Sequence, residues 1–124
     1  MKLVLALLAA LMIVFPAYAQ HSHGEKGPNG GDTQDVAGVE LELVMNENTL
    51  TLYVTEGDHK PVAVKGMSAS AMITTTSGQE AVKLEPAGDS VLKGTSKGAI
   101  GAGTSVTIMI KTAAGKSGQA RFKK

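Results

Sequence analysis

The chain has 124 residues, no cysteine and a formal net charge of +1, because 12 Lys and Arg stand against 11 Asp and Glu. Without cysteine it has no disulfides, thiol nucleophiles or thiolate metal sites. The near-neutral charge argues against nucleic acid or an anionic membrane surface as the partner, because both require clustered Lys and Arg.

The first 19 residues have the pattern of a signal peptide. Lys2 is followed by an apolar run over residues 3–15, and residues 17–19 (Ala-Tyr-Ala) form an A-x-A cleavage site. The run of about 13 residues is shorter than the roughly 20 that span a bilayer, which disfavours the alternative of a retained membrane anchor. The pattern predicts a periplasmic protein with no stable membrane insertion after cleavage.

Residues 20–35 read QHSHGEKGPNGGDTQD, a polar, glycine-rich segment without apolar periodicity. Such a segment cannot bury enough apolar surface to offset the entropy lost on ordering. We therefore expect residues 20–35 to be a flexible arm and residues 36–124 to form a single folded domain.

From residue 39 onward, apolar and polar residues alternate with period two, which is typical of half-buried strands. The expected strands cover residues 39–45, 49–55, 67–76, 90–93, 105–111 and 118–123, with one more through residues 82 and 84 that ends near residue 86. Seven short strands separated by turn residues predict an all-β domain, either a small antiparallel, Ig-like β-sandwich or a small barrel.

No pattern typical of an enzyme occurs in the sequence. There is no Gly-x-Ser-x-Gly elbow, and no phosphate-binding glycine loop precedes a helix. Glu40 and Glu42 share one face of an expected strand, and we interpret them as solvated carboxylates because no pocket accompanies them. We expect no enzymatic activity.

His21 and His23 form a local cluster within the arm, and imidazole nitrogen suits copper, zinc or nickel. If cleavage follows Ala19, the amine of Gln20, the amide nitrogen of His21 and its imidazole can chelate Cu(II) in a square plane. Cleavage one residue later places His23 third, another favourable chelate, whereas cyclisation of Gln20 removes the amine. The alternative is a solvated, inert tail.

Three further residues are candidate ligands. His59 lies in a polar loop between strands, where a simple polar turn also explains it. Methionine thioethers favour Cu(I), and the alternation directs Met72 and Met109 outward while Met45 and Met67 face the core. An exposed Met pair can bind a soft ion or mark a contact surface. Alternatively, the two residues cover the less buried face of a sheet.

Several short motifs give the mature chain a family resemblance. They are HGEKGPNGG at residues 23–31, VELELV at 39–44, LYVT at 52–55, KPV at 60–62, LEPAG at 84–88 and LKG at 92–94. With these motifs the chain resembles small exported proteobacterial proteins that carry an HGPNGG motif, and the N-terminal β-domain of periplasmic adaptor subunits of heavy-metal efflux pumps. The resemblance implies a periplasmic β-sandwich associated with heavy-metal handling. Only His23 and the Gly-Pro-Asn-Gly-Gly turn match the motif, and here residues 25–27 interrupt its His-Gly-Pro sequence.

We therefore expect a periplasmic accessory protein that binds or buffers a Cu or Zn ion in association with a heavy-metal efflux system. The expected metal ligands are His21, His23, His59, Met72 and Met109. The alternative is a structural or interaction domain without metal, which docks another envelope protein through a sheet edge or its Met-bearing face.

Overall fold

The computed structural model describes residues 25–124. The expected signal peptide and the start of the arm, with His21 and His23, lie outside this range. No helix within it is long and apolar enough to cross a membrane.

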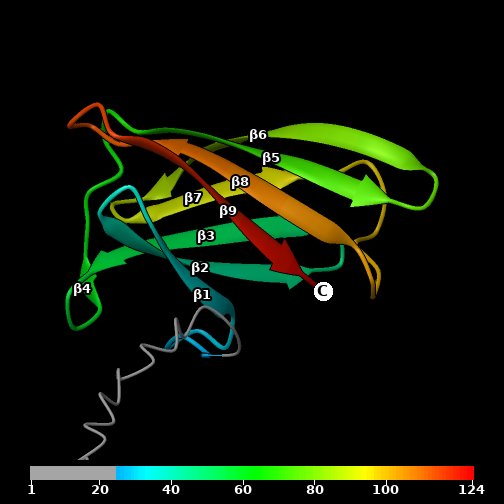
Figure 1. The fold of residues 1–124 in the computed structure, drawn as a ribbon, viewed down its shortest axis with the longest axis horizontal. Coiled ribbons are helices and arrows are strands. Elements are labelled where there is room, and N and C mark those ends of the chain that lie inside the picture. Colours follow the sequence, from blue (N-terminus) through cyan, green and yellow to red (C-terminus); the bar gives the residue numbers. More distant parts are fainter. Residues whose placement is uncertain (1–24) are drawn as a thin grey trace, which may run out of the picture.

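The described chain consists of nine antiparallel strands (Figure 1). They are β1 (Asp32–Val36), β2 (Val39–Asn46), β3 (Thr49–Glu56), β4 (Lys60–Pro61), β5 (Ser68–Thr75), β6 (Gly78–Gly88), β7 (Val91–Thr95), β8 (Ser105–Lys111) and β9 (Ser117–Lys123). Their order in the sheet is β1-β2-β3-β7-β6-β5-β8-β9, with β4 added beside β3. The prediction of a small antiparallel all-β domain is confirmed, although the strands exceed the expected seven.

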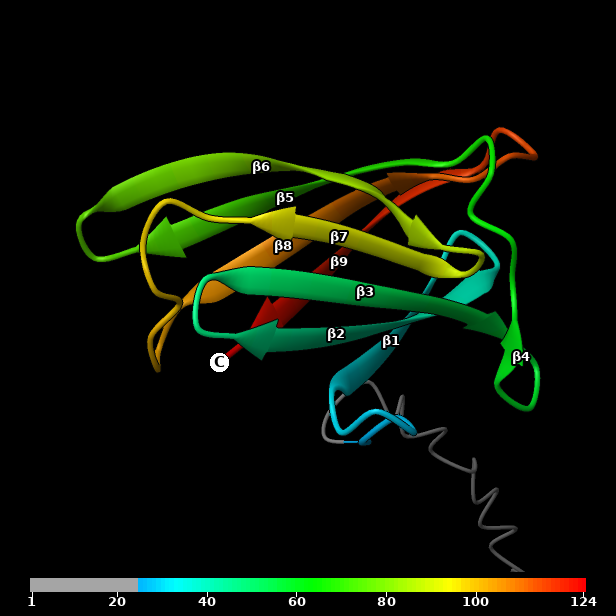
Figure 2. The same cartoon turned by 180° about the vertical axis from the view of Figure 1, so that it is seen from behind.

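The long strand β6 turns this single sheet into two layers. Residues 78–84 of β6 pair with β5, whereas residues 85–88 pair with β7 and contain a register shift between Pro86 and Gly88. One layer contains β1, β2, β3 and β7, and the other contains β5, β8 and β9 (Figures 1 and 2). The result is one continuous, nearly closed sheet.

The two end strands of the sheet, β1 and β9, lie beside each other and are joined through side chains. The Gln34 amide donates a hydrogen bond to the carbonyl oxygen of Arg121. Farther along, Gly118 lies so close to Val36 that an added Cβ would overlap the valine side chain. We call this junction the β1–β9 seam.

The space between the layers is filled almost entirely by aliphatic side chains. The residues on the inward faces include Leu41, Leu43, Leu50, Leu52, Val54, Ala71, Ile73, Val82, Leu84, Leu92, Val106, Ile108, Ile110, Ala120 and Phe122, all of which are buried. Their positions follow the period-two alternation of the sequence. Met45 and Met67, expected to face the core, are partly buried and pack against it.

The prediction that residues 20–35 form a flexible arm is wrong for the part that the structure describes, residues 25–35. Residues 32–35 belong to β1, where Asp32 pairs with Leu43 and Asp35 with Glu40 of β2. Residues 27–31 form a hydrogen-bonded turn. This segment is ordered by backbone pairing with β2 and by polar contacts, and not by burial of its own apolar side chains, which is why its composition does not indicate order.

Candidate functional site

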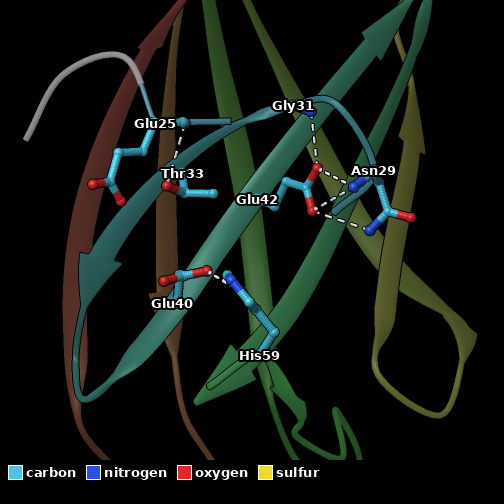
Figure 3. Close-up of polar contacts among 7 residues, drawn as sticks. All are labelled: Glu25, Asn29, Gly31, Thr33, Glu40, Glu42 and His59. Atoms are coloured by element: carbon cyan, nitrogen blue, oxygen red, sulfur yellow. Dashed lines mark hydrogen bonds and ion pairs between the residues drawn. The ribbon is translucent and has the colours of Figure 1, made fainter. Parts of the chain in front are cut away.

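The carboxylate of Glu42 is buried beneath a turn formed by residues 27–31, which we call the Gly27–Gly31 turn (Figure 3). It accepts hydrogen bonds from the backbone N–H of Asn29 at 2.9 Å, from the Asn29 side-chain amide at 3.0 Å and from the backbone N–H of Gly31 at 2.8 Å. Only 3% of the residue is exposed. The interpretation of Glu42 as a solvated carboxylate is therefore wrong.

The sequence Gly-Pro-Asn-Gly-Gly fits this turn for steric reasons. Gly30 has φ of +81°, a conformation that residues with a Cβ rarely adopt. A Cβ on Gly27 would overlap the carboxylate of Glu42, and a Cβ on Gly31 would overlap a carbonyl group of β2. Two backbone hydrogen bonds close the turn, from Gly30 N to Gly27 O at 3.0 Å and from Gly27 N to Gly31 O at 2.8 Å.

The turn also fixes the beginning of the described chain against β1. The backbone N–H of Thr33 donates to the carbonyl oxygen of Glu25 at 3.2 Å (Figure 3). Lys26 Nζ lies 2.6 Å from Asp32 Oδ1. Glu25, where the described chain begins, therefore lies at the edge of β1.

His59 lies near the same face of β2 and is paired with Glu40 (Figure 3). Its Nδ1 atom is 3.0 Å from Glu40 Oε1, and the side chains are 53% and 22% exposed, respectively. Asp35 and Glu56 line a shallow cleft together with Glu40. His59 has φ of +60°, an uncommon conformation for a residue with a Cβ. We call Glu40 and His59, with the two flanking carboxylates, the His59 cluster.

Sequence reasoning placed His59 in a loop but missed its partner. Glu40 and His59 meet because Glu40 pairs with Thr55 of β3 and the chain then turns back after Glu56. Only the register of the β2–β3 hairpin reveals this proximity. Within residues 25–124, no group of three or more His, Asp or Glu side chains is arranged to hold a metal ion. The His59 cluster is thus at most a part of a metal site in the described chain.

Met72 and Met109 lie on the outer face of the other layer, as the alternation predicts. Met72 is paired with Thr107, and Met109 is paired with Ser70, so the two methionines are diagonal neighbours on β5 and β8. Both are partly buried. They are therefore near each other but belong to a different layer from His59.

Comparisons with models of known protein families, with curated proteins and with solved structures found no match for this chain. The candidate site consequently rests on its geometry alone.

Proposed function

We propose that this protein is an exported accessory module of the cell envelope that holds a Cu or Zn ion weakly and reversibly. The proposed ligands are the imidazoles of His21, His23 and His59, with Glu40 orienting His59. The observation that carries the proposal is the 3.0 Å contact between His59 Nδ1 and Glu40 Oε1. Following the family resemblance, we propose a heavy-metal efflux system as the partner.

The pairing with Glu40 prepares His59 for a ligand role. A histidine that binds a metal through one ring nitrogen commonly donates its other N–H to a carboxylate, which fixes the tautomer and the ring orientation. Glu40 Oε1 lies 3.0 Å from Nδ1 of His59, where it can orient the ring, and Nε2 of the half-exposed imidazole is then available to an ion. The uncommon backbone conformation of His59 is consistent with such a role, since strain gathers at functional residues.

The position of Glu25, where the described chain begins, supports a site shared by His59 and the two arm histidines. His23 precedes Glu25 by two residues, which span at most about 7 Å of chain. Glu25 is bonded to Thr33, and Thr33 is one step of about 7 Å along β1 from Asp35, the partner of Glu40. An arm imidazole and His59 can therefore share one ion.

Imidazole ligands suit Cu(II) and Zn(II), whereas thioethers favour Cu(I). Because Met72 and Met109 lie on the other layer, we assign them no part in this site and regard them only as a separate soft-ion candidate.

The experiment is a titration of the protein from residue 20 onward with Zn(II) and Cu(II), followed by NMR of the imidazole groups. We expect shifts at all three histidines at micromolar metal. We also expect about tenfold weaker binding in Glu40→Gln, since loss of an orienting partner costs 10–100-fold, and at least as large a loss in His59→Ala, which removes a proposed ligand. Glu47→Gln, which removes an exposed carboxylate from the β2–β3 turn, is the matched control. Metal affinity unchanged by His59→Ala would contradict the shared site, and absence of any histidine shift would contradict metal binding altogether.

A second candidate function is that of an interaction domain without metal. The observation that favours it is an open trough of about 590 Å³ beside Met109, on the outer face of the second layer.

A further inference from the structure

A shallow trough of about 590 Å³ crosses the outer face of the second layer. One row of neighbouring residues runs across four strands, namely Lys83 on β6, Ser70 on β5, Met109 on β8 and Gln119 on β9. Lys111, Ser68 and Ser117 form the next row. We call this feature the Met109 trough. It has an apolar floor, short hydroxyl side chains and a lysine on each side.

The two charged side chains that line the trough, Lys83 and Lys111, are both basic. Strands β5, β8 and β9 contain Lys111, Arg121 and Lys123 and no acidic residue. At the trough margin, Lys83 has only a long contact of 3.9 Å with the exposed Glu85. In contrast, residues 25–60 hold eight acidic and two basic residues. The near-neutral net charge of the chain is therefore distributed unevenly, and this face of the domain is basic. A basic face is electrostatically complementary to an anionic partner.

The shape of the trough selects the class of partner. It is open along its length, whereas small-molecule sites enclose most of their ligand. A membrane surface calls for roughly four to eight clustered basic residues and apolar side chains that enter the lipid. With Lys83 on β6, this face has four basic residues, the lower end of that range, and Glu85 lies beside Lys83. No aromatic residue lines the trough, so it offers no large ring to enter the lipid. An extended acidic peptide segment fits better, because it can lie along the rows and meet side chains from each strand.

The spacing of the two lysines defines the segment further. Lys83 and Lys111 are separated by two strand spacings and by one two-residue step along the strand, or about 12 Å in total. In an extended peptide, residues i and i+4 lie about 13 Å apart on one face, and residue i+2 lies between them on that face. We propose that the Met109 trough binds an extended protein segment with the pattern acidic-x-apolar-x-acidic. The carboxylates meet Lys83 and Lys111, and the central residue lies above β5, halfway between them. From there its apolar side chain reaches Met109 on the neighbouring strand β8, and the flexible thioether of Met109 adapts to its shape.

The test uses blocked peptides and methyl-labelled methionine in the protein from residue 20 onward. The probe is Gly-Glu-Ser-Leu-Ser-Glu-Gly at low ionic strength. One control peptide carries Gln in place of both Glu residues, and a second carries adjacent Glu residues as Gly-Glu-Glu-Leu-Ser-Ser-Gly. We expect the probe to shift the Met109 methyl signal and to leave that of Met45, which packs against the core, unchanged.

We expect both control peptides to bind at least about fivefold more weakly, and the Lys83→Ala/Lys111→Ala protein to bind the probe about fivefold more weakly, as the loss of exposed charge pairs implies. Lys97→Ala, at an exposed lysine outside the trough, is the matched control and should leave binding unchanged.

Equal binding of the Gln peptide or of the adjacent-Glu peptide would overturn the proposal, as would no Met109 shift at roughly 5 mM probe. Sedimentation with phosphatidylglycerol vesicles in the absence of any peptide shift would overturn it in favour of a membrane surface. Because none of these measurements requires metal, their outcome is independent of the proposed metal site.

Discussion

Glu40 and Glu42 are two residues apart on the same face of β2, yet their surroundings differ completely. Glu40 is partly exposed and contacts an imidazole. Glu42 is buried and accepts hydrogen bonds from two backbone N–H groups and one side-chain amide. A buried carboxylate is stable only where such donors replace water. The Gly27–Gly31 turn supplies these donors and is itself held in place by them, so Glu42 and the turn stabilise each other.

We expect Glu42→Ala to lower the free energy of unfolding by about 2–3 kcal/mol, because it leaves three donors beneath the turn without their acceptor. Glu40→Ala should cost less than about 1 kcal/mol, since the contact that it removes is largely exposed. Urea unfolding of the two variants and the parent protein, at constant pH, measures the difference. Equal losses in the two variants would show that the turn does not depend on Glu42.

The alternation of apolar and polar residues predicts which side chains face the core. It does not predict which outward-facing side chains are buried or what they contact. Leu41 and Leu43 are buried as their parity indicates, and so is Phe122. Glu42 has outward parity and is buried nonetheless, because a segment eleven residues or more away in sequence folds over it. The steric demands of the Gly-Pro-Asn-Gly-Gly sequence signal a tight turn, but they do not reveal which carboxylate it covers. His59 and Glu40 pose the same problem, since their contact depends on a register that alternation leaves open.

At the scale of elements, the β1–β9 seam differs from every other junction between neighbouring strands in the described chain. Elsewhere, adjacent strands are joined by backbone pairing, which is continuous except for the register shift between β6 and β7. At the seam, the contacts are the Gln34 amide and the packing of Val36 on Gly118. An unpaired strand edge is available to other chains, and the side-chain contacts of the seam cover part of it.

We expect Gly118→Ala to destabilise the domain by about 1–3 kcal/mol, because the new Cβ overlaps Val36 and pushes β1 away from β9. Val36→Ala, which shortens the opposing side chain, should cost less when combined with Gly118→Ala than on its own. A double-mutant cycle from thermal or urea unfolding measures this coupling. Additive losses would mean that the two strands do not touch in solution. Gly101→Ala is a suitable control, since a Cβ there meets no neighbour.

Two of the nine strands have no clear signal in the sequence. β1 reads DTQDV and has no apolar alternation, so only its pairing with β2 makes it a strand. β4 is two residues long and is extended because it lies beside the end of β3. The expected end of β6 near Pro86 is also wrong. The strand continues to Gly88 through the register shift, which lets its last residues pair with β7 and not with β5.

At the scale of the whole molecule, the two layers have different charge because acidic residues are concentrated in the N-terminal part of the described chain and basic residues in its C-terminal part. The acidic N-terminal part forms β1, β2 and β3, and the basic C-terminal part forms β8 and β9. The His59 cluster and the Met109 trough therefore lie on the outer faces of different layers. The proposed metal site and the proposed peptide site therefore share no residue. This separation does not follow from composition, since only the sheet order determines which strands share a face.

The sheet order also determines how the domain folds. Leu52 of β3 pairs with Leu92 of β7, and Ile73 of β5 pairs with Val106 of β8, so central parts of the core form only after long loops close. Closing a long loop costs conformational entropy before the contacts form, and this cost slows folding. All-β domains with distant pairings therefore fold in milliseconds to seconds. We expect the main refolding phase from urea to fall on this timescale, and to be unaffected by reducing agent because the chain has no cysteine. Stopped-flow fluorescence of Tyr53, which lies on β3 opposite Val91 of β7, follows the joining of these two strands. Complete refolding within about 100 μs would be inconsistent with this sheet order, since it is the range of proteins dominated by local contacts.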